Sequence, residues 1–344
     1  MTLNNFLKVL SCLIFTQSFL SCTHINKKFL KEQPSTRQFS EIKLFDYKKY
    51  PPIQPKLTLA KPVETNRFVL KLYEFFHRRK YEVYKFTFPT AKVISENETT
   101  NTAYYYKPKK IKGKLPLVIV FPILSGDHTI SEWQAKVLAN KGFAVIRFEK
   151  KKSFLKADVK PDFHVEILKH TIIDARRALD HILTWPEIDP EKIAVTGISL
   201  GGISASLLMI ADNRIKVGGF FLLGGNLSKI VTQSKERFVT KYRDELIKKV
   251  DLKDLENWLR PFYQEIDPLV YSNRLDPKNI IMFSAKLDNV IPEECSQEIW
   301  SAMGNPYWIK VPLVGHYTAF AYFFYGNKKI AKFFHSKFKL LDLK

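Results

Sequence analysis

Cysteine is scarce in this sequence, whose 344 residues include only Cys12, Cys22 and Cys295. Three thiols offer neither the cross-links of a disulfide-rich domain nor a cysteine-based metal site. We therefore expect no metal centre and no disulfide framework. A hydrophobic content of 45% and an aromatic content of 14% predict a sizeable apolar core instead.

Acidic residues are also few, because 34 Asp and Glu face 55 Lys and Arg, for a net charge of +21. The basic residues form no cluster with aromatic residues of the kind that binds nucleic acid, so we expect no nucleic-acid partner. The excess comes mostly from lysine. It is consistent with an affinity for anionic lipid or polysaccharide, or with a drift of composition toward lysine.

The apolar run at the N-terminus, Val9 to Leu20, is too short to predict a membrane-spanning helix. With Lys8 before it, the run resembles an export signal, which we expect to cover residues 1–21. Its end, Phe19 to Cys22, is similar to the lipobox of bacterial lipoproteins, in which the cysteine is lipidated. We expect an exported, membrane-anchored lipoprotein with Cys22 as the lipidation site. A secretory signal cleaved nearby, with Cys22 unmodified, is the alternative.

Two further regions follow the signal. Residues 22–67 are rich in lysine and proline and lack hydrophobic periodicity, which predicts a tether or loosely packed arm. Residues 68–344 alternate between short apolar or β-branched runs and helical patterns. This alternation predicts one α/β domain with a mainly parallel sheet, helices on both faces and no internal repeat.

The runs fall in a readable order. Two strands without a helix between them predict an antiparallel sheet edge, and the later strands and helices alternate. We expect strands at Tyr81–Phe88, Thr102–Tyr106, Leu115–Phe121, Phe143–Phe148, Ile193–Val195, Val217–Leu223, Asn279–Ser284 and Tyr307–Val311. We expect helices at Thr129–Lys141, Asp162–Leu183, Ile203–Ile210 and Lys328–Leu340.

The segment Gly197 to Gly201 follows an apolar run and opens a small-residue helix. Glycines at this spacing keep Cβ atoms out of a sharp strand-to-helix turn, and the turn leaves the hydroxyl of Ser199 exposed above the sheet. Strand before and helix after are the context that this motif requires. The pattern predicts that Ser199 is a nucleophile.

A serine nucleophile needs a base and a group that orients the base. His316 follows the last strand in a glycine-containing loop, and we expect it to be the base; His128 is the competing histidine. Asp288 follows the strand at 279–284 and is expected to orient the imidazole, with Asp267 as the runner-up.

The order Ser199, Asp288, His316 is that of α/β-hydrolases. From about Tyr81 to the C-terminus, the chain resembles the dienelactone hydrolase and acetyl xylan esterase group. The residues that carry the resemblance are Asp174–Asp180, Ile188–Pro190, Thr196–Gly202, Leu287–Asp288 and Gly315–His316.

The resemblance implies an oxyanion hole made of two backbone N–H groups. One is the amide of Leu200, directly after the nucleophile. The other comes from the loop after Phe121, at Ile123 or Leu124. Many members of the group have His-Gly in this loop, whereas this chain has Pro122 and Ile123, so the second donor stays open.

The connection at about 226–275 interrupts the alternation and contains amphipathic stretches with several aromatic residues. We expect it to form a helical lid over the catalytic face. An excursion packed to one side of the sheet is the alternative.

These features predict a serine hydrolase that cleaves small-molecule or glycan carboxylic esters through an acyl-enzyme, without metal or organic cofactor. A serine peptidase of the prolyl oligopeptidase type is the second possibility, although the chain has no room for the propeller domain of those enzymes. A catalytically silent binding lipoprotein is the third. The oligomeric state is not predicted.

Overall fold

The computed structural model describes residues 23–25, 42–60, 79–110, 113–125 and 128–340. The expected signal at 1–21 and Cys22 lie outside the described residues. No helix among the described residues combines the length and the apolar character needed to cross a membrane.

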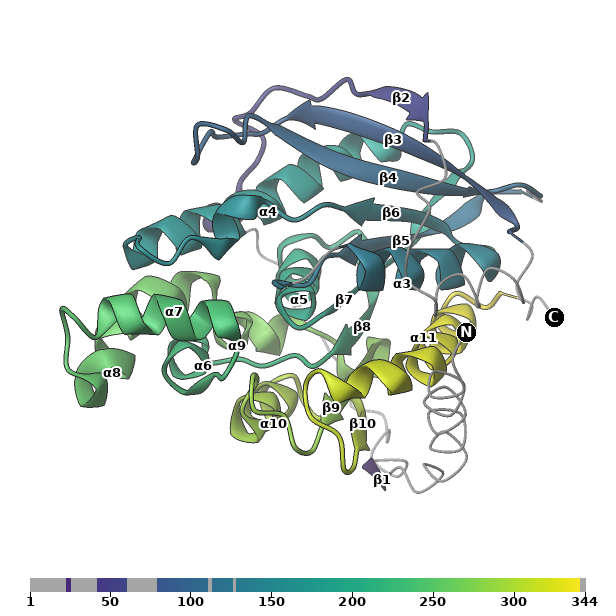
Figure 1. The fold of residues 1–344 in the computed structure, drawn as a ribbon. Helices are drawn as coiled ribbons and strands as arrows, with labels where there is room; N and C mark the ends of the chain where they lie inside the picture. Colours follow the sequence, from purple (N-terminus) through teal and green to yellow (C-terminus); the bar gives the residue numbers. More distant parts are fainter. Residues whose placement is uncertain (1–22, 26–41, 61–78, 111–112, 126–127, 341–344) are drawn as a thin grey trace, which may run out of the picture.

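One sheet runs through the described residues in the order β1-β10-β9-β8-β7-β5-β6-β4-β3-β2 (Figure 1). Neighbours from β10 to β6 pair in parallel, whereas β4, β3 and β2 form an antiparallel edge. Both the parallel centre and the antiparallel edge confirm the predicted arrangement. The strands are β1 Thr23–Ile25, β2 Lys56–Leu59, β3 Tyr81–Pro89, β4 Thr100–Pro108, β5 Leu115–Phe121, β6 Ala144–Phe148, β7 Ile188–Ile198, β8 Ile215–Phe221, β9 Ile280–Ala285 and β10 Tyr307–Val311.

Helices cover both faces of the sheet, and each face has its own apolar core. Residues of α4 and α5 share one core with the sheet, and residues of α3 and α11 share the other. All seven residues of β5 are buried because its two faces meet these two cores. The helices outside the 226–275 segment are α3 Thr129–Asn140, α4 Pro161–Ile182, α5 Leu200–Ala211, α10 Glu293–Ala302 and α11 Phe323–Lys337.

The segment between β8 and β9 folds into helices that lie together below α4 and to the left of α5 in Figure 1. Leu255 and Leu259 on one of them are fully buried, so their helix packs onto the body of the domain. The N–H of Lys235 donates to the carbonyl of Asn289 at 2.8 Å. The segment therefore contacts the loop that carries Asp288. Its helices are α6 Leu227–Gln233, α7 Arg237–Leu246, α8 Leu252–Tyr263 and α9 Pro268–Tyr271.

The described part of the expected arm, residues 42–60, is packed more closely than its composition predicts. Phe45 is fully buried, and its carbonyl accepts a hydrogen bond from Arg176 at 2.7 Å. Arg177 donates to the carbonyl of Pro51 at 3.0 Å, and β2 pairs with β3. The arm packs closely although its sequence lacks apolar periodicity, because arginine side chains of α4 hydrogen-bond to its backbone carbonyls.

Candidate active site

Ser199 lies on a strained turn between β7 and α5. Its φ of 57° and ψ of −122° are rare for a residue with a side chain and cost on the order of 1–3 kcal/mol. A Cβ at Gly197 would lie 2.1 Å from the carbonyl oxygen of Gly201, and one at Gly201 would lie 2.6 Å from that of Phe121. The turn therefore requires glycine at both positions, as the motif predicts.

Asp288 and His316 come together after β9 and β10. His316 Nδ1 lies 2.8 Å from one carboxylate oxygen of Asp288 and 3.1 Å from the other. The N–H groups of Val290 and Ile291 donate to Asp288 Oδ1 at 2.8 and 2.9 Å, which fixes the carboxylate. Because Nδ1 faces the acid, Nε2 is the ring nitrogen left for proton transfer.

Backbone contacts hold the acid and base loops against each other. The N–H of Leu287 donates to the carbonyl of Val314 at 2.9 Å. A Cβ at Gly315 would lie 2.9 Å from the carbonyl oxygen of Leu287, so a side chain there would separate the loops. This glycine therefore lets the His316 loop pass close to the Asp288 loop.

The nucleophile and the acid–base pair share one edge of the sheet. Ser199 follows β7, and its N–H donates to Phe221 at the end of β8 at 2.9 Å. The next residue, Leu222, donates to Phe283 of β9 at 2.7 Å. Ligands of open parallel sheets bind at this carboxyl edge. Among the described residues, no hydrogen bond joins Ser199 to His316.

Free backbone amides flank Ser199. Among the described residues, the N–H groups of Ile123, Leu124 and Leu200 have no hydrogen-bond acceptor. Leu200 begins α5, where the helix dipole favours negative charge. The loop after β5 passes directly over Gly201. The two sides of the predicted oxyanion hole therefore lie at the same turn, with amides available on each.

The competing candidates lie next to helix starts. His128 directly precedes α3, and its backbone carbonyl accepts hydrogen bonds from Ser131 and Glu132. The carboxylate of Asp267 accepts the N–H groups of Leu227 at 2.7 Å and Leu269 at 2.9 Å. Asp267 therefore holds the start of α6 and α9 together, and the carboxylate that meets His316 is that of Asp288.

Burial shifts several titratable groups elsewhere. It lowers the pKa of His164 and of His170 to about 4, so both rings are neutral near pH 7. It raises the pKa of the Cys295 thiol to about 12, which makes this thiol a poor nucleophile. The described residues hold no group of three or more His, Cys, Asp or Glu side chains that could bind a metal ion.

The motif at Asp174–Asp180, which carries part of the resemblance, lies in a structural cluster. Asp174 is buried and receives 2.8 Å hydrogen bonds from Arg177 and from β3–β4 residues. Arg177 also donates to the carbonyls of Pro51 and Pro89. This motif fastens α4 to the arm and to the antiparallel edge.

Lys150 is a polar residue at the site that the sequence patterns do not single out. It follows β6 on the carboxyl edge of the sheet, and its ammonium donates to the carbonyl of Leu124. The only sequence signal is its position two residues after a predicted strand, within a run of three lysines.

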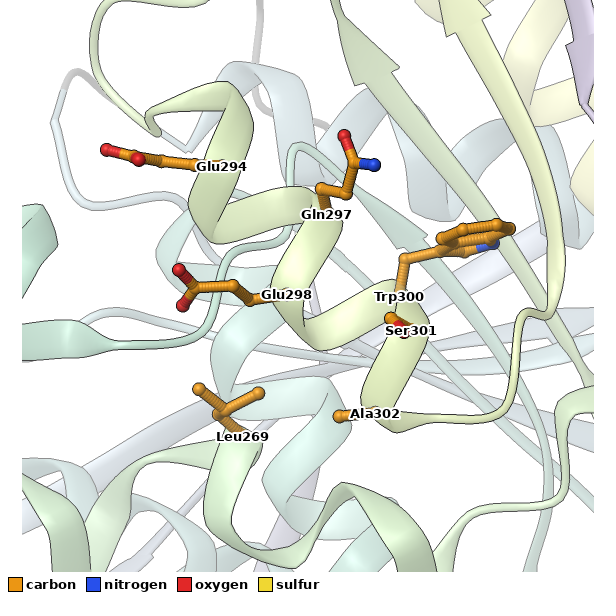
Figure 2. Close-up of a pocket in the computed structure, with 7 residues that line it drawn as sticks. All are labelled: Leu269, Glu294, Gln297, Glu298, Trp300, Ser301 and Ala302. Carbon is orange, nitrogen blue, oxygen red and sulfur yellow. The ribbon is translucent and has the colours of Figure 1, made fainter.

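A pocket of about 610 Å³ lies on α10 and α9, and its lining includes none of Ser199, Asp288 and His316 (Figure 2). Its lining includes Glu294 and Glu298, whose carboxylates lie 2.7 and 3.7 Å from the ammonium of Lys229. Trp300 of the same helix donates to the carbonyl of Pro306 at 2.9 Å. The charged groups that line this pocket thus already have partners.

Solved structures with the same architecture identify the fold. An acetyl xylan esterase from a Paenibacillus species matches with a TM-score of 0.62 and 15% identity, over 83% of this chain and 89% of that one. The fold is that of the α/β-hydrolases. An acetyl xylan esterase from a Thermoanaerobacterium species matches at 0.59 and 15% identity, over 84% and 90% of the two chains.

A puromycin-hydrolysing peptidase from Mycobacterium tuberculosis shares the α/β-hydrolase fold at a TM-score of 0.53 and 15% identity. The match covers 76% of this chain but 38% of the peptidase. No protein-family model matches the sequence, and no curated protein matches it. The predicted fold is confirmed, because the sheet order and these structures agree.

Proposed function

We propose that this α/β-hydrolase is a serine hydrolase that cleaves carboxylic esters through an acyl-enzyme. The observation that carries the proposal is the hydrogen-bonded pair of Asp288 and His316 at the sheet edge where Ser199 stands on its strained turn. This combination supplies a nucleophile, a base and a group that orients the base. The acetyl xylan esterases, which match over nearly their whole length, favour an ester over an amide substrate.

In the first half-reaction, Ser199 Oγ bonds to the carbonyl carbon of the ester while His316 Nε2 takes the hydroxyl proton. The oxyanion that forms lies between the amide of Leu200 and that of Ile123 or Leu124. Collapse of this intermediate expels the alcohol, which receives the proton from His316. Asp288 stabilises the imidazolium between these steps.

In the second half-reaction, water attacks the acyl carbon and gives a proton to His316. The bond between the acyl carbon and Ser199 Oγ then breaks, the carboxylic acid is released, and Oγ takes back the proton from His316. Water is the only co-reactant consumed, and the bonds and protons balance without any change of oxidation state.

Labelling with a fluorophosphonate probe tests this function. The wild type should label and should hydrolyse p-nitrophenyl acetate, and Ser199→Ala should lose the label and about 10⁴- to 10⁶-fold of kcat. Ser204→Ala is the matched control, because its hydroxyl donates to Leu200 within α5. An unlabelled wild type, or equal labelling of Ser199→Ala, would sink the proposal.

A panel of acetyl, butyryl and longer aryl esters beside peptide amides separates esterase from peptidase. We expect the acetyl esters, free or on a glycan, to be the best substrates. Activity confined to peptide amides would overturn the esterase assignment. Absence of any turnover with a properly folded protein would instead favour the binding lipoprotein.

The segment at 226–275 is proposed as the lid of this site. The contact of Lys235 with Asn289 supports this role, because it joins the segment to the acid loop. The chain is also proposed to be anchored to a membrane through a lipid on Cys22, on the basis of the sequence at 19–22. Cys22→Ala should release the protein from the membrane fraction, and an unchanged fraction would exclude this anchor.

A further inference from the structure

The loop that carries the second oxyanion donor has few bonds of its own. It follows β5, and Pro122 contributes no N–H. The amides of Ile123 and Leu124 have no acceptor among the described residues. Such a loop is useful in catalysis only if its amides are fixed before the reaction, because reorganisation would consume the stabilisation that they give.

Two contacts fix the loop at either end of these amides. On one side, a Cβ at Gly201 would lie 2.8 Å from the carbonyl oxygen of Pro122, so the loop rests directly on the elbow. On the other side, the ammonium of Lys150 donates to the carbonyl of Leu124. The amides of Ile123 and Leu124 lie between these two anchored carbonyls.

Lys150 also places a positive charge beside the loop. Burial lowers the pKa of Lys150, while the charge of Glu236 at the start of α7 acts in the opposite direction. Glu236 is itself buried and accepts the N–H groups of Phe238 and Val239. Partial removal of water strengthens the attraction between an ammonium and a developing oxyanion.

We propose that Lys150 is a positioning residue for the oxyanion hole. By donating to the carbonyl of Leu124, its ammonium holds the amides of Ile123 and Leu124 in place. The proposal rests on the proposed ester hydrolase function of the same site. The ammonium acts through the loop, and its charge adds to the field that meets the tetrahedral intermediate. It acts on the transition state more than on the bound ester.

Lys150→Met tests the proposal, because it keeps the length of the side chain and removes the ammonium. With p-nitrophenyl acetate, kcat should fall about 10- to 100-fold while KM changes less than about 3-fold. The inhibition constant of an aryl trifluoromethyl ketone, which forms an oxyanion on the serine, should rise by the factor by which kcat/KM falls. Lys150→Arg should recover most of the activity, since a guanidinium can also donate to Leu124.

Lys107→Met is the matched control. This lysine of β4 is also partly buried and pairs with Glu187 at 2.7 Å, but it lies beyond the start of β6, at the sheet edge opposite Ser199, so its loss should leave kcat and the ketone affinity unchanged. If Lys150→Met keeps both values within about 2-fold while Ser199 still labels, the proposal is wrong. A fall in kcat with an unchanged ketone affinity would likewise overturn it. Failure of the proposed ester hydrolase function would be distinguishable, because labelling and ester hydrolysis would then be the same in Ser199→Ala as in the wild type.

A pH profile covers the case in which Lys150→Met does not fold. The pKa of Lys150 lies below its ordinary value of 10.5, so wild-type kcat/KM should decline in alkaline solution as the ammonium loses its proton. Lys150→Arg stays charged, and its profile should lack this decline. Identical alkaline profiles for the two proteins would contradict the proposal.

Discussion

Asp174 and Asp288 are both shielded from water, but they stand in regions with different tasks. The carboxylate of Asp174 joins α4 to the antiparallel edge and receives 2.8 Å hydrogen bonds from Thr90, Ala91, Asn101 and Arg177. The carboxylate of Asp288 receives two backbone amides and the ring of His316. Asp174 is therefore paired with a guanidinium, whereas Asp288 is paired with an imidazole.

The difference teaches that burial alone does not mark a catalytic acid. A guanidinium offers only donors and does not pass on a proton, so the pair between Arg177 and Asp174 is purely structural. An imidazole can accept and donate a proton at its ring nitrogens, so the pair between His316 and Asp288 can take part in proton transfer. Lys150 and Lys151 connect the two regions, because one donates to Leu124 and the other lies 3.6 Å from Asp174.

The same substitution at both aspartates gives the sharpest test of this comparison, and the larger effect is expected at Asp288. Asp288→Asn removes the charge that stabilises the imidazolium and favours the wrong tautomer of His316. We expect kcat for p-nitrophenyl acetate to fall about 10³- to 10⁴-fold, with a melting temperature within about 3 °C of wild type. A kcat within 10-fold of wild type would show that another carboxylate, such as Asp267, orients the base.

Asp174→Asn should have the opposite signature. It leaves Arg177 and Lys151 without their anionic partner in a buried region, which costs about 3–5 kcal/mol of unfolding free energy. Turnover per folded molecule should stay within about 2-fold. Denaturant unfolding and active-site titration with a fluorophosphonate measure the two quantities. A stable Asp174→Asn protein with low kcat would erase the distinction between the regions.

The smallest effect concerns acid stability of the α4 region. His170 packs against Tyr50 of the arm, its Nδ1 has no partner among the described residues, and burial lowers its pKa to about 4. The unfolded chain binds a proton near pH 6.5 and the fold does not, so stability is complete above pH 6.5 and declines as pH falls toward 4. We expect His170→Phe to reduce this decline by about 1–2 kcal/mol, after allowance for solvent screening.

Unfolding in denaturant at several pH values from 7 to 4 measures that slope. His181→Phe provides a comparison on the same helix. Burial lowers the pKa of His181 as well, but this ring is more exposed than His170, so its replacement should change the decline less. Equal slopes for wild type and His170→Phe would mean that the buried ring does not resist protonation.

The sequence predicts most elements of the domain because they are set locally. The strands β5 and β10 have the predicted bounds. All of β5 is buried, and β10 is buried except at Tyr307 and Lys310, which are partly exposed. The strand β2 and the helix α10 were not predicted. Each becomes stable through contacts with distant segments, as β2 does by pairing with β3.

The candidate site divides in the same way. Gly197 and Gly201 identify the elbow from sequence because steric limits of the backbone act over five residues. The acid that partners His316 is not fixed by such a local pattern. Asp267 and Asp288 both lie between the nucleophile and His316 in the sequence, so either could supply the carboxylate. The structure brings Asp288 to the ring and turns Asp267 toward two helix starts.

The sequence by itself determined the alternation of strands and helices, the sharp turn at Ser199 and the order of the three candidate catalytic residues. These depend on local burial and backbone sterics. Only the tertiary structure decided that Arg176 and Arg177 hold the arm, that Asp288 meets His316 and that Lys150 holds the loop at Leu124. Such contacts join segments far apart in the chain, and their geometry exists only once the strands have taken their order in the sheet.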